Sequence, residues 1–384
     1  MIYKLSKYLL YIFLFNIVSY ICLYIFYKYK HPFWFRSPVA QLYKPFNYNG
    51  ILTQYRDPIN EQVTQLEKDF SWYHFSTDED IDSLCSLLNN NYLIGKEYNY
   101  KYTPPFIKFL LNIPYRHFKT LENVDRKLWQ VFLKHHDEII AADTTRPLKL
   151  KINEDICHSF YVDFLCIKKK YRGQSYAPKL ILKMEPAIWS PNTYAFGTFN
   201  MFIFKKDIYP LPFHYLCKYN YYKLKLDTFE SKPCDDCIIK LNEDFLENTF
   251  RFFNSYIKKY KIYQIYTIEE FKYIFLNDII DCYIKIDGNQ VMGMVSFYDS
   301  QLVCKKTMRK SCELFYALCD KNLFTFAINK MKDTNYELLL CTNLLDNKLF
   351  IDSFPFEYTN NSYYHLYNYH SPKIKPKECG LLIL

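Results

Sequence analysis

The pattern of apolar and polar positions predicts a chain in which strands and helices take turns. Apolar residues recur at helical spacing through residues 81–88 and 106–111. β-Branched and aromatic residues crowd residues 159–167, which we expect to form a buried strand, and a helix follows over residues 177–184. We expect the same plan to recur as strands over residues 281–285 and 291–298, a helix over residues 324–332 and a strand over residues 336–340. Strands that alternate with helices indicate an α/β or α+β fold.

The first thirty residues contain a long uncharged stretch. Residues 9–27 carry no charge and are long enough to cross a hydrocarbon core of about 30 Å. No small-residue cleavage site follows, which favours a retained membrane anchor over a removed signal peptide. Lys28 and Lys30 behind the stretch predict that the rest of the chain faces the cytoplasm. A buried or interfacial amphipathic helix is the alternative.

Composition and charge exclude several classes of protein. Half of the residues are apolar and 23% are charged, which excludes a disordered chain. The length of 384 residues predicts two or three domains, or one large duplicated one. The net charge is +9, but the basic residues are dispersed except at residues 168–172. This is too little for a nucleic-acid surface and indicates a local anion site, so we expect no nucleic-acid partner.

Cysteine and histidine spacing gives no metal-binding motif. The 13 cysteines are irregularly spaced, and the one CxxC, Cys234 to Cys237, lacks a second pair. We interpret that CxxC as a solvated turn and most other cysteines as small core residues in a reducing compartment. The adjacent His135 and His136 are interpreted as part of a helix surface. The sequence therefore predicts no metal.

The basic residues lie between the predicted strand 159–167 and the helix that follows it. A strand, a basic turn and a helix N-terminus together outline an anion site, and a solvated turn is the alternative. Residues 172–177, Arg-Gly-Gln-Ser-Tyr-Ala, resemble the acyl-CoA turn of the GCN5-related acetyltransferase fold.

A wider set of short motifs resembles the glycylpeptide N-myristoyltransferase family over residues 32–384. The matching motifs occur in the family's order. They are Pro32-Phe33-Trp34, Phe70-Ser71-Trp72, Asn91-Tyr92, Tyr102-Thr103-Pro104, Phe164-Leu165-Cys166-Ile167, Ala177-Pro178, Ser296-Phe297-Tyr298, Phe315-Tyr316 and Gly380-Leu381-Leu382-Ile383-Leu384.

This resemblance implies an α/β (α+β) fold of two tandem acetyltransferase-like halves that share a twisted sheet. Residues 32–210 would be the half that binds acyl-CoA, and residues 211–384 the half that binds peptide. The uncharged stretch adds residues 1–31 as a transmembrane anchor, with the catalytic domain facing the cytoplasm. We expect the protein to be a monomer.

The resemblance also implies an enzyme, a glycylpeptide N-tetradecanoyltransferase. It would transfer myristoyl from myristoyl-CoA to the amine of an N-terminal glycine on a protein substrate, with no cofactor besides that co-substrate. In the family, the backbone amides of the pair matched by Phe164 and Leu165 hold the developing oxyanion. The family's general base is the terminal carboxylate, which here belongs to Leu384.

Further site residues follow from the matched motifs. The residues expected to bind the CoA phosphates or cover the acyl-CoA are Phe33, Trp34, Lys169, Lys170, Arg172, Ser175 and Ala177. Tyr298 and Tyr316 match aromatic positions of the peptide site. His214 falls near a family motif, although a surface histidine is an equal interpretation.

A second function stays open. Residues 93–97 lack the acidic run that the family carries after its Asn-Tyr motif, and residues 356–361 replace a glycine-rich turn. These departures favour a catalytically inactive relative that binds acyl-CoA or peptide as an interaction or structural protein. The retained C-terminal motif favours the active transferase.

Overall fold

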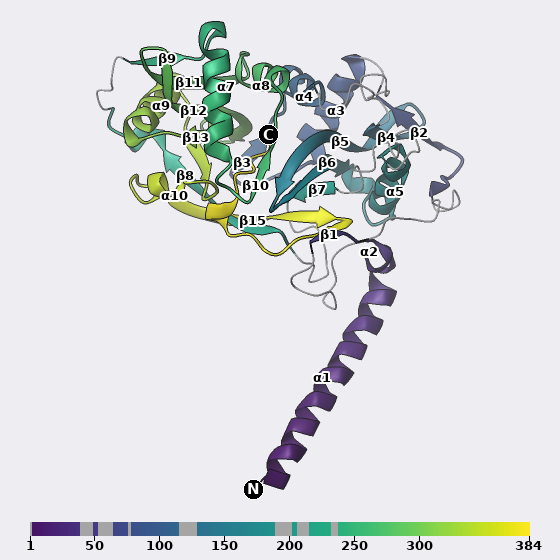
Figure 1. Ribbon diagram of the computed structural model, residues 1–384. Helices are drawn as coiled ribbons and strands as arrows, with labels where there is room; N and C mark the ends of the chain where they lie inside the picture. The colour runs from purple at the N-terminus through teal and green to yellow at the C-terminus, as the bar shows by residue number, and fades with distance from the viewer. Residues whose placement is uncertain are drawn as a thin grey trace.

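One sheet organises the part of the chain that the structure describes. The computed structural model describes residues 2–38, 49–52, 64–75, 78–114, 129–188, 202–205, 215–231 and 237–384. Within these ranges, a 14-stranded sheet has the order β2-β4-β5-β6-β7-β15-β8-β14-β13-β12-β11-β9, with β10 added beside β5 and β3 beside β12. Figure 1 shows β4–β6 and β11–β13 on opposite sides of the molecule, with the C-terminus drawn between them.

The first half of the chain contains five α-helices among its described residues. They are α1 (Ile2–Lys30), α2 (Pro32–Arg36), α3 (Asp78–Asn91), α4 (Pro104–Leu111) and α5 (Tyr176–Ile188), with the 3₁₀ turn η4 (Lys169–Tyr171). The strands of this half are β1 (Gly50–Ile51), β2 (Phe70–His74), β3 (Tyr98–Tyr100), β4 (Gln130–His135), β5 (Glu138–Ile152), β6 (Asp155–Ile167) and β7 (Phe202–Lys205).

The second half also combines helices and strands. Its helices are α7 (Leu246–Ile257), α8 (Ile268–Phe275), α9 (Lys321–Asp333) and α10 (Lys348–Ile351), with the turns η5 (Leu226–Thr228), η6 (Glu243–Phe245) and η7 (Pro376–Glu378). Its strands are β8 (Cys217–Lys225), β9 (Ile238–Lys240), β10 (Ile262–Gln264), β11 (Ile280–Asp287), β12 (Gln290–Cys304), β13 (Lys310–Leu318), β14 (Leu338–Thr342), β15 (Glu357–Tyr367) and β16 (Tyr369–His370).

Each half contains an antiparallel hairpin followed by a parallel crossover. In the first half, β5 and β6 are antiparallel, and α5 connects β6 to the parallel strand β7. In the second half, β12 and β13 are antiparallel, and α9 connects β13 to the parallel strand β14. Strand β15 pairs with β7 on one side and β8 on the other, so it joins the two halves into one sheet.

Side-chain alternation along the strands divides the core into layers. Val131 and Leu133 of β4 pack in a cluster with α5, whereas Phe132 between them packs in a large cluster on the other face with α3 and α4. Strand β12 does the same, with Val295 packing against α9 and Met294 on the opposite face. The sheet is therefore covered on both faces.

Helix α1 lies outside this body. Figure 1 shows it projecting away from the sheet, and its apolar side chains over residues 8–26 are mostly exposed. Residues 7–30 form a segment long and apolar enough to cross a membrane, with a mean hydropathy of 2.2.

The expected helices at 81–88, 106–111, 177–184 and 324–332 and the expected strand at 159–167 are present in α3, α4, α5, α9 and β6. One local prediction is wrong. His135 ends β4 and His136 lies in the two-residue turn before β5, so they are not part of a helix. The turn residues are His136 and Asp137, without the Asn-Gly or Asp-Gly signal that marks such a hairpin in sequence.

Candidate functional site

A cavity of about 1740 Å³ lies between the two halves, lined by residues of both. Its origin is visible in the strand pairing. Among the described residues, β6 pairs with the parallel strand β7 at Phe160 and Tyr161, and the two strands then diverge. Residues 162–167 of β6 follow that point and line the cavity. The divergence therefore opens one edge of β6 toward a ligand.

Strand β6 carries a bulge inside this cavity. The β5–β6 register advances from Thr144 opposite Asp163 to Ala142 opposite Cys166, so two residues of β6 face one of β5. Phe164, in the bulge, has a φ of 52°, which is uncommon for a side chain of this size. Its amide donates to Asp163 Oδ1 at 2.9 Å. The bulge takes the Phe164 amide out of the β5–β6 hydrogen-bond ladder. A ligand atom could therefore accept the hydrogen bond of this amide in place of the Asp163 carboxylate.

The basic turn joins β6 to α5 at the cavity wall. Three residues per turn in η4 place Lys169 and Arg172 on the same side, and both line the cavity. Arg172 donates from Nε to the Ile167 carbonyl at 3.0 Å and from Nη2 to the Asn91 carbonyl at 2.6 Å. Ser175, with φ 62°, ends the turn, and α5 then begins, so the first amides of a 13-residue helix lie beside these cations.

The predicted acyl-CoA residues divide into two groups. Trp34, Lys169, Arg172, Ser175 and Ala177 line the cavity, as do the predicted pair Phe164 and Leu165. Phe33 and Lys170 are not among the lining residues. Phe33 contacts the Trp34 ring edge-on at 4.6 Å, and exposed Lys170 lies over the Tyr171 ring at 4.7 Å.

The C-terminal segment runs through the core to the same cavity. Residues 381–384 are all buried, and the Tyr364 hydroxyl donates to the Leu381 carbonyl at 3.1 Å. Gly380 passes so close to Tyr260 that an added Cβ would lie 2.7 Å from its ring. Leu384 lines the cavity, and the Arg146 guanidinium donates a hydrogen bond to its main-chain oxygen.

Charged groups gather around this point. Burial lowers the pKa of Arg146, although the nearby Asp163 opposes the shift. Burial also raises the pKa of Asp143 well above its ordinary value, and Asp163 adds like-charge repulsion. Asp143 is 1% exposed, and its Oδ1 has no hydrogen-bond partner in the described structure. The site therefore combines one half-buried cation with carboxyl groups whose environments differ.

The two predicted peptide residues have different surroundings. Tyr298 lines the cavity, stacks on Phe106 at 6.2 Å, and has a raised pKa because of burial and the nearby Glu313. Tyr316 is fully buried, packs edge-on against Phe253 at 5.1 Å and is not among the lining residues. His214 and Cys234, considered in the sequence, lie outside the described residues.

Sequence reasoning missed Arg146, Asp143, Asp163 and Glu313. Arg146 lies 238 residues from Leu384 along the chain, so no local motif connects the two. One signal for Arg146 was present in the sequence: the Arg-Pro pair lies at the centre of a long strand-like stretch, and a cation inside a strand needs a partner. The adjacency of Asp163 to the Phe164-Leu165 motif was a second signal.

Comparison with known proteins defines the class to which this fold and cavity belong. The family model described as "Myristoyl-CoA:protein N-myristoyltransferase, N-terminal domain" matches residues 52–195, and that for the C-terminal domain matches residues 219–380. Together they match well over half of the chain. The chain therefore belongs to the myristoyl-CoA:protein N-myristoyltransferase family, a family of acyltransferases.

Individual relatives match along nearly the whole chain. Glycylpeptide N-tetradecanoyltransferase 2 of Danio rerio is 21% identical, over 93% of this chain and 78% of the relative. Glycylpeptide N-tetradecanoyltransferase of Drosophila melanogaster is 22% identical, over 92% and 81%. The crystal structure of Saccharomyces cerevisiae N-myristoyltransferase with bound myristoyl-CoA matches with a TM-score of 0.79 at 18% identity, over 93% of this chain and 100% of that one.

These matches confirm three predictions: the family, the α/β fold class and an acyltransferase enzyme. The structural likeness at 18% identity concerns the fold. The division of the chain at residues 31 and 210 and the roles of the individual site residues stay predictions.

Replacing Asp143 with Asn should stabilise the protein at neutral pH. The raised pKa of the buried carboxyl means that stability falls as pH rises above about 4, where the unfolded carboxyl ionises. The asparagine side chain does not ionise, so the stability of the variant lacks this dependence on pH. Calorimetric melting should give a higher midpoint for Asp143→Asn at about pH 7, and the difference should vanish near pH 3.

Asp287→Asn is the matched control for this experiment, because it removes an exposed carboxyl at the end of β11. It should give no pH-dependent gain. Identical pH profiles for Asp143→Asn and the wild-type protein would contradict the assignment of Asp143 as a destabilising buried acid.

Proposed function

We propose that this chain transfers the acyl group of myristoyl-CoA to the amine of an N-terminal glycine on a protein substrate. The observation that carries the proposal is the convergence on one cavity of the β6 bulge, the basic turn before α5, and Leu384. These three features offer amide donors, an anion site and a proton acceptor. The family match supports the same acyl donor.

The basic turn is suited to the phosphate groups of CoA. Lys169 and Arg172 supply positive charge, and the first amides of α5 point along a helix dipole that favours anions. The bulge at Phe164 and Leu165 would then lie at the thioester. Its amides would stabilise the negative charge that develops on the carbonyl oxygen, an effect of roughly 3–4 kcal/mol per donor. Asp163 must first release the Phe164 amide.

The charges near Leu384 suit a protonated amine. Two acidic groups, Leu384 and Asp163, lie near the one guanidinium of Arg146, and burial favours the neutral form of Asp143 by raising its pKa, so we infer that the centre has a net negative charge. A glycine ammonium would balance that charge. The contact from Arg146 would hold the Leu384 carboxylate in place as the general base, so we assign Arg146 as a positioning residue.

The proton balance sets the order of events. An α-carboxyl and an α-amine differ by about 4 pKa units in water, or about 5 kcal/mol, so deprotonation of the ammonium before attack is costly. Desolvation raises the basicity of the carboxylate, which takes a first proton from the ammonium and passes it to solvent, because only the neutral amine has a lone pair for attack. As the nitrogen bonds to the thioester carbon it becomes more acidic, and it gives its second proton to the carboxylate. The C–S bond then breaks, and the Leu384 carboxyl group protonates the CoA thiolate. The products are an amide, free CoA and one proton in solvent.

One observation favours the alternative, a relative that binds acyl-CoA or peptide without transferring the acyl group. The Asp163 side chain accepts a hydrogen bond from the Phe164 amide, so it already occupies the donor that the oxyanion would use. If Asp163 stays there with acyl-CoA bound, the thioester oxygen loses a donor and the cavity serves for binding alone.

We also propose that α1 anchors the protein in a membrane with the cavity in the cytoplasm. Among the described residues, most of its apolar side chains are exposed, and a hydrocarbon core would bury them. Lys28 and Lys30 at the end nearer the body favour a cytoplasmic orientation. A soluble interfacial helix or a signal sequence is the alternative.

Arg172→Ala should weaken acyl-CoA binding at least tenfold, because it removes a charge-assisted contact and loosens the basic turn. Arg251→Ala, which removes an exposed arginine of α7, is the matched control and should bind normally. Calorimetric titration with myristoyl-CoA checks both. Equal affinities would move the phosphate site elsewhere.

Converting the Leu384 carboxyl to an amide by semisynthesis should lower kcat by 10²–10⁴-fold, the usual contribution of a general base. Myristoyl-CoA binding should persist, because its proposed contacts are at the basic turn. The measurement is thiol release with a peptide that begins with glycine, with the melting temperature determined beside it. Native turnover by the amide would rule out this carboxylate as the base.

Removing residues 1–31 should release the protein from membranes. Alkaline carbonate extracts peripheral proteins and leaves those held by a spanning helix, so the full chain should stay in the pellet while residues 32–384 enter the supernatant. Quantitative immunoblotting of both fractions gives the result. Complete extraction of the full chain would refute the anchor.

A further inference from the structure

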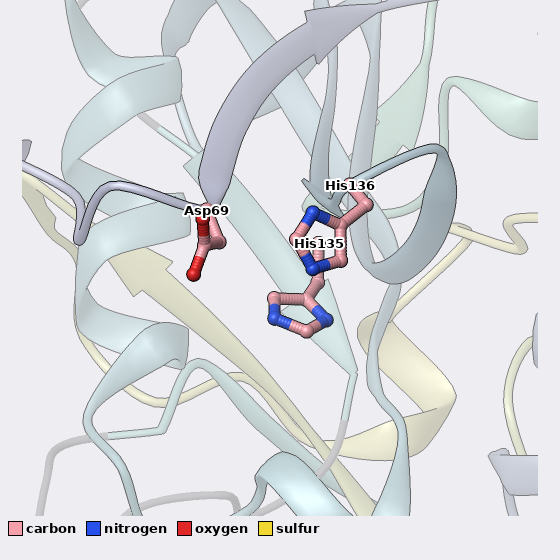
Figure 2. Close-up of side chains that lie close together, drawn as sticks. All are labelled: Asp69, His135 and His136. Atoms are coloured by element: carbon pink, nitrogen blue, oxygen red, sulfur yellow. The ribbon is translucent and has the colours of Figure 1, made fainter.

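Three potential metal ligands meet at the outer edge of the sheet. Asp69 immediately precedes β2, His135 ends β4, and His136 begins the turn to β5. They meet because β2 pairs with β4, with Phe70 opposite His135, and because the His136 amide donates to the Asp69 carbonyl at 2.9 Å. Figure 2 shows the Asp69 carboxylate beside the two imidazole rings.

The backbone at His136 departs from the strand pattern. Successive side chains of a strand point to opposite faces, so two adjacent histidines would ordinarily separate. His136 has a φ of 52°, and the two ring centroids lie 4.4 Å apart. Glycine or asparagine would adopt this conformation at lower cost. The left-handed conformation at His136 therefore accompanies the close approach of the two histidine rings.

His135 is held in an orientation suited to metal binding. The Tyr171 hydroxyl lies 3.1 Å from His135 Nδ1, and the Phe70 ring packs 4.6 Å from the imidazole. This hydrogen bond at Nδ1 fixes the orientation of the ring and leaves Nε2 as the atom that can bind a metal. Outer-shell hydrogen-bond partners orient metal-bound histidines in the same way. Asp69 and His136 are exposed and can rotate, whereas His135 is half-buried.

We propose that Asp69, His135 and His136 bind one divalent transition cation of the Zn²⁺ class, with water as the fourth ligand. One donor atom from each residue can be chosen so that all three lie within 4.8 Å of one another. Ligands of a tetrahedral zinc at about 2.0–2.1 Å are about 3.4 Å apart, so rotation of the two exposed side chains closes the site. Two imidazoles and a carboxylate are ligands that zinc accepts.

The location gives this site a structural role. None of the three ligands lines the cavity, so the cation would not contact the reacting groups. Tyr171, however, belongs to η4 in the basic turn, between Lys170 and Arg172. A cation on His135 would therefore tie the β4–β5 hairpin and the start of β2 to the turn that lies beside α5. The proposal does not depend on acyl transfer.

Zinc titration of the full chain, freed of metal by chelation, tests the proposal. Calorimetry with zinc chloride and a competing chelator gives stoichiometry and affinity, and thermal melting gives the stabilisation that binding to the folded state produces. The variants are Asp69→Asn and His136→Gly, and glycine also relieves the backbone conformation, so this variant should fold. Asp137→Asn is the matched control, because it removes the same charge from the adjacent exposed residue.

We expect one equivalent of zinc to be lost in Asp69→Asn and His136→Gly and retained in Asp137→Asn, with the zinc-induced rise in melting temperature following the same pattern. Tyr171→Phe should weaken zinc binding 10–100-fold. All variants keep every cysteine, so zinc held by thiols would be unchanged among them. Zinc binding in Asp69→Asn and His136→Gly that equals the wild-type value, or no binding by the wild-type protein, would overturn the proposal.

Discussion

The hydrogen bond from Arg146 to the main-chain oxygen of Leu384 constrains much of the molecule. Arg146 is half-buried, and a partly desolvated guanidinium is costly unless it is paired; the pair here joins the centre of β5 to Leu384. The final four residues must therefore run through the core. Gly380 allows this path by passing against Tyr260, where a larger residue would collide.

The same constraint brings the two halves together. Strand β10 of the second half pairs with β5 of the first, and Ile262 of β10 also bridges to Cys379 just before the buried segment. Tyr364 of β15, the strand that joins the halves, donates to Leu381. A cavity lined from both halves results. In our account, acyl-CoA enters along the divergence of β6 from β7, and the amine approaches the charges near Leu384.

Local motifs made part of this structure predictable. The strand at 159–167, the basic turn and the following helix each depend on residues close in sequence, and their pattern indicated these elements. The anion site at this turn stays a prediction. The direction of the Lys170 side chain was harder to predict from the sequence, because a 3₁₀ turn points it away from Lys169 and Arg172. The hairpin at His136 was also missed, because its turn lacks the usual glycine or asparagine.

The long-range part of the site could not be predicted from the sequence. The contact between Arg146 and Leu384 depends on the path of the whole chain. The engagement of the Phe164 amide by Asp163 depends on one side-chain rotamer at a bulge, which no pattern of apolar and polar residues encodes. Buried charges become visible only when the fold shows which of them share a cavity.

The central claim is that Arg146 holds the Leu384 carboxylate where an amine is acylated. Steady-state acyl transfer by Arg146→Gln and Arg146→Lys, beside myristoyl-CoA affinity and melting temperature, tests it most directly. The account predicts that Arg146→Gln binds myristoyl-CoA normally, stays folded and loses at least a hundredfold in kcat, and that Arg146→Lys regains part of the rate. A folded Arg146→Gln variant that turns over at the wild-type rate would contradict the account.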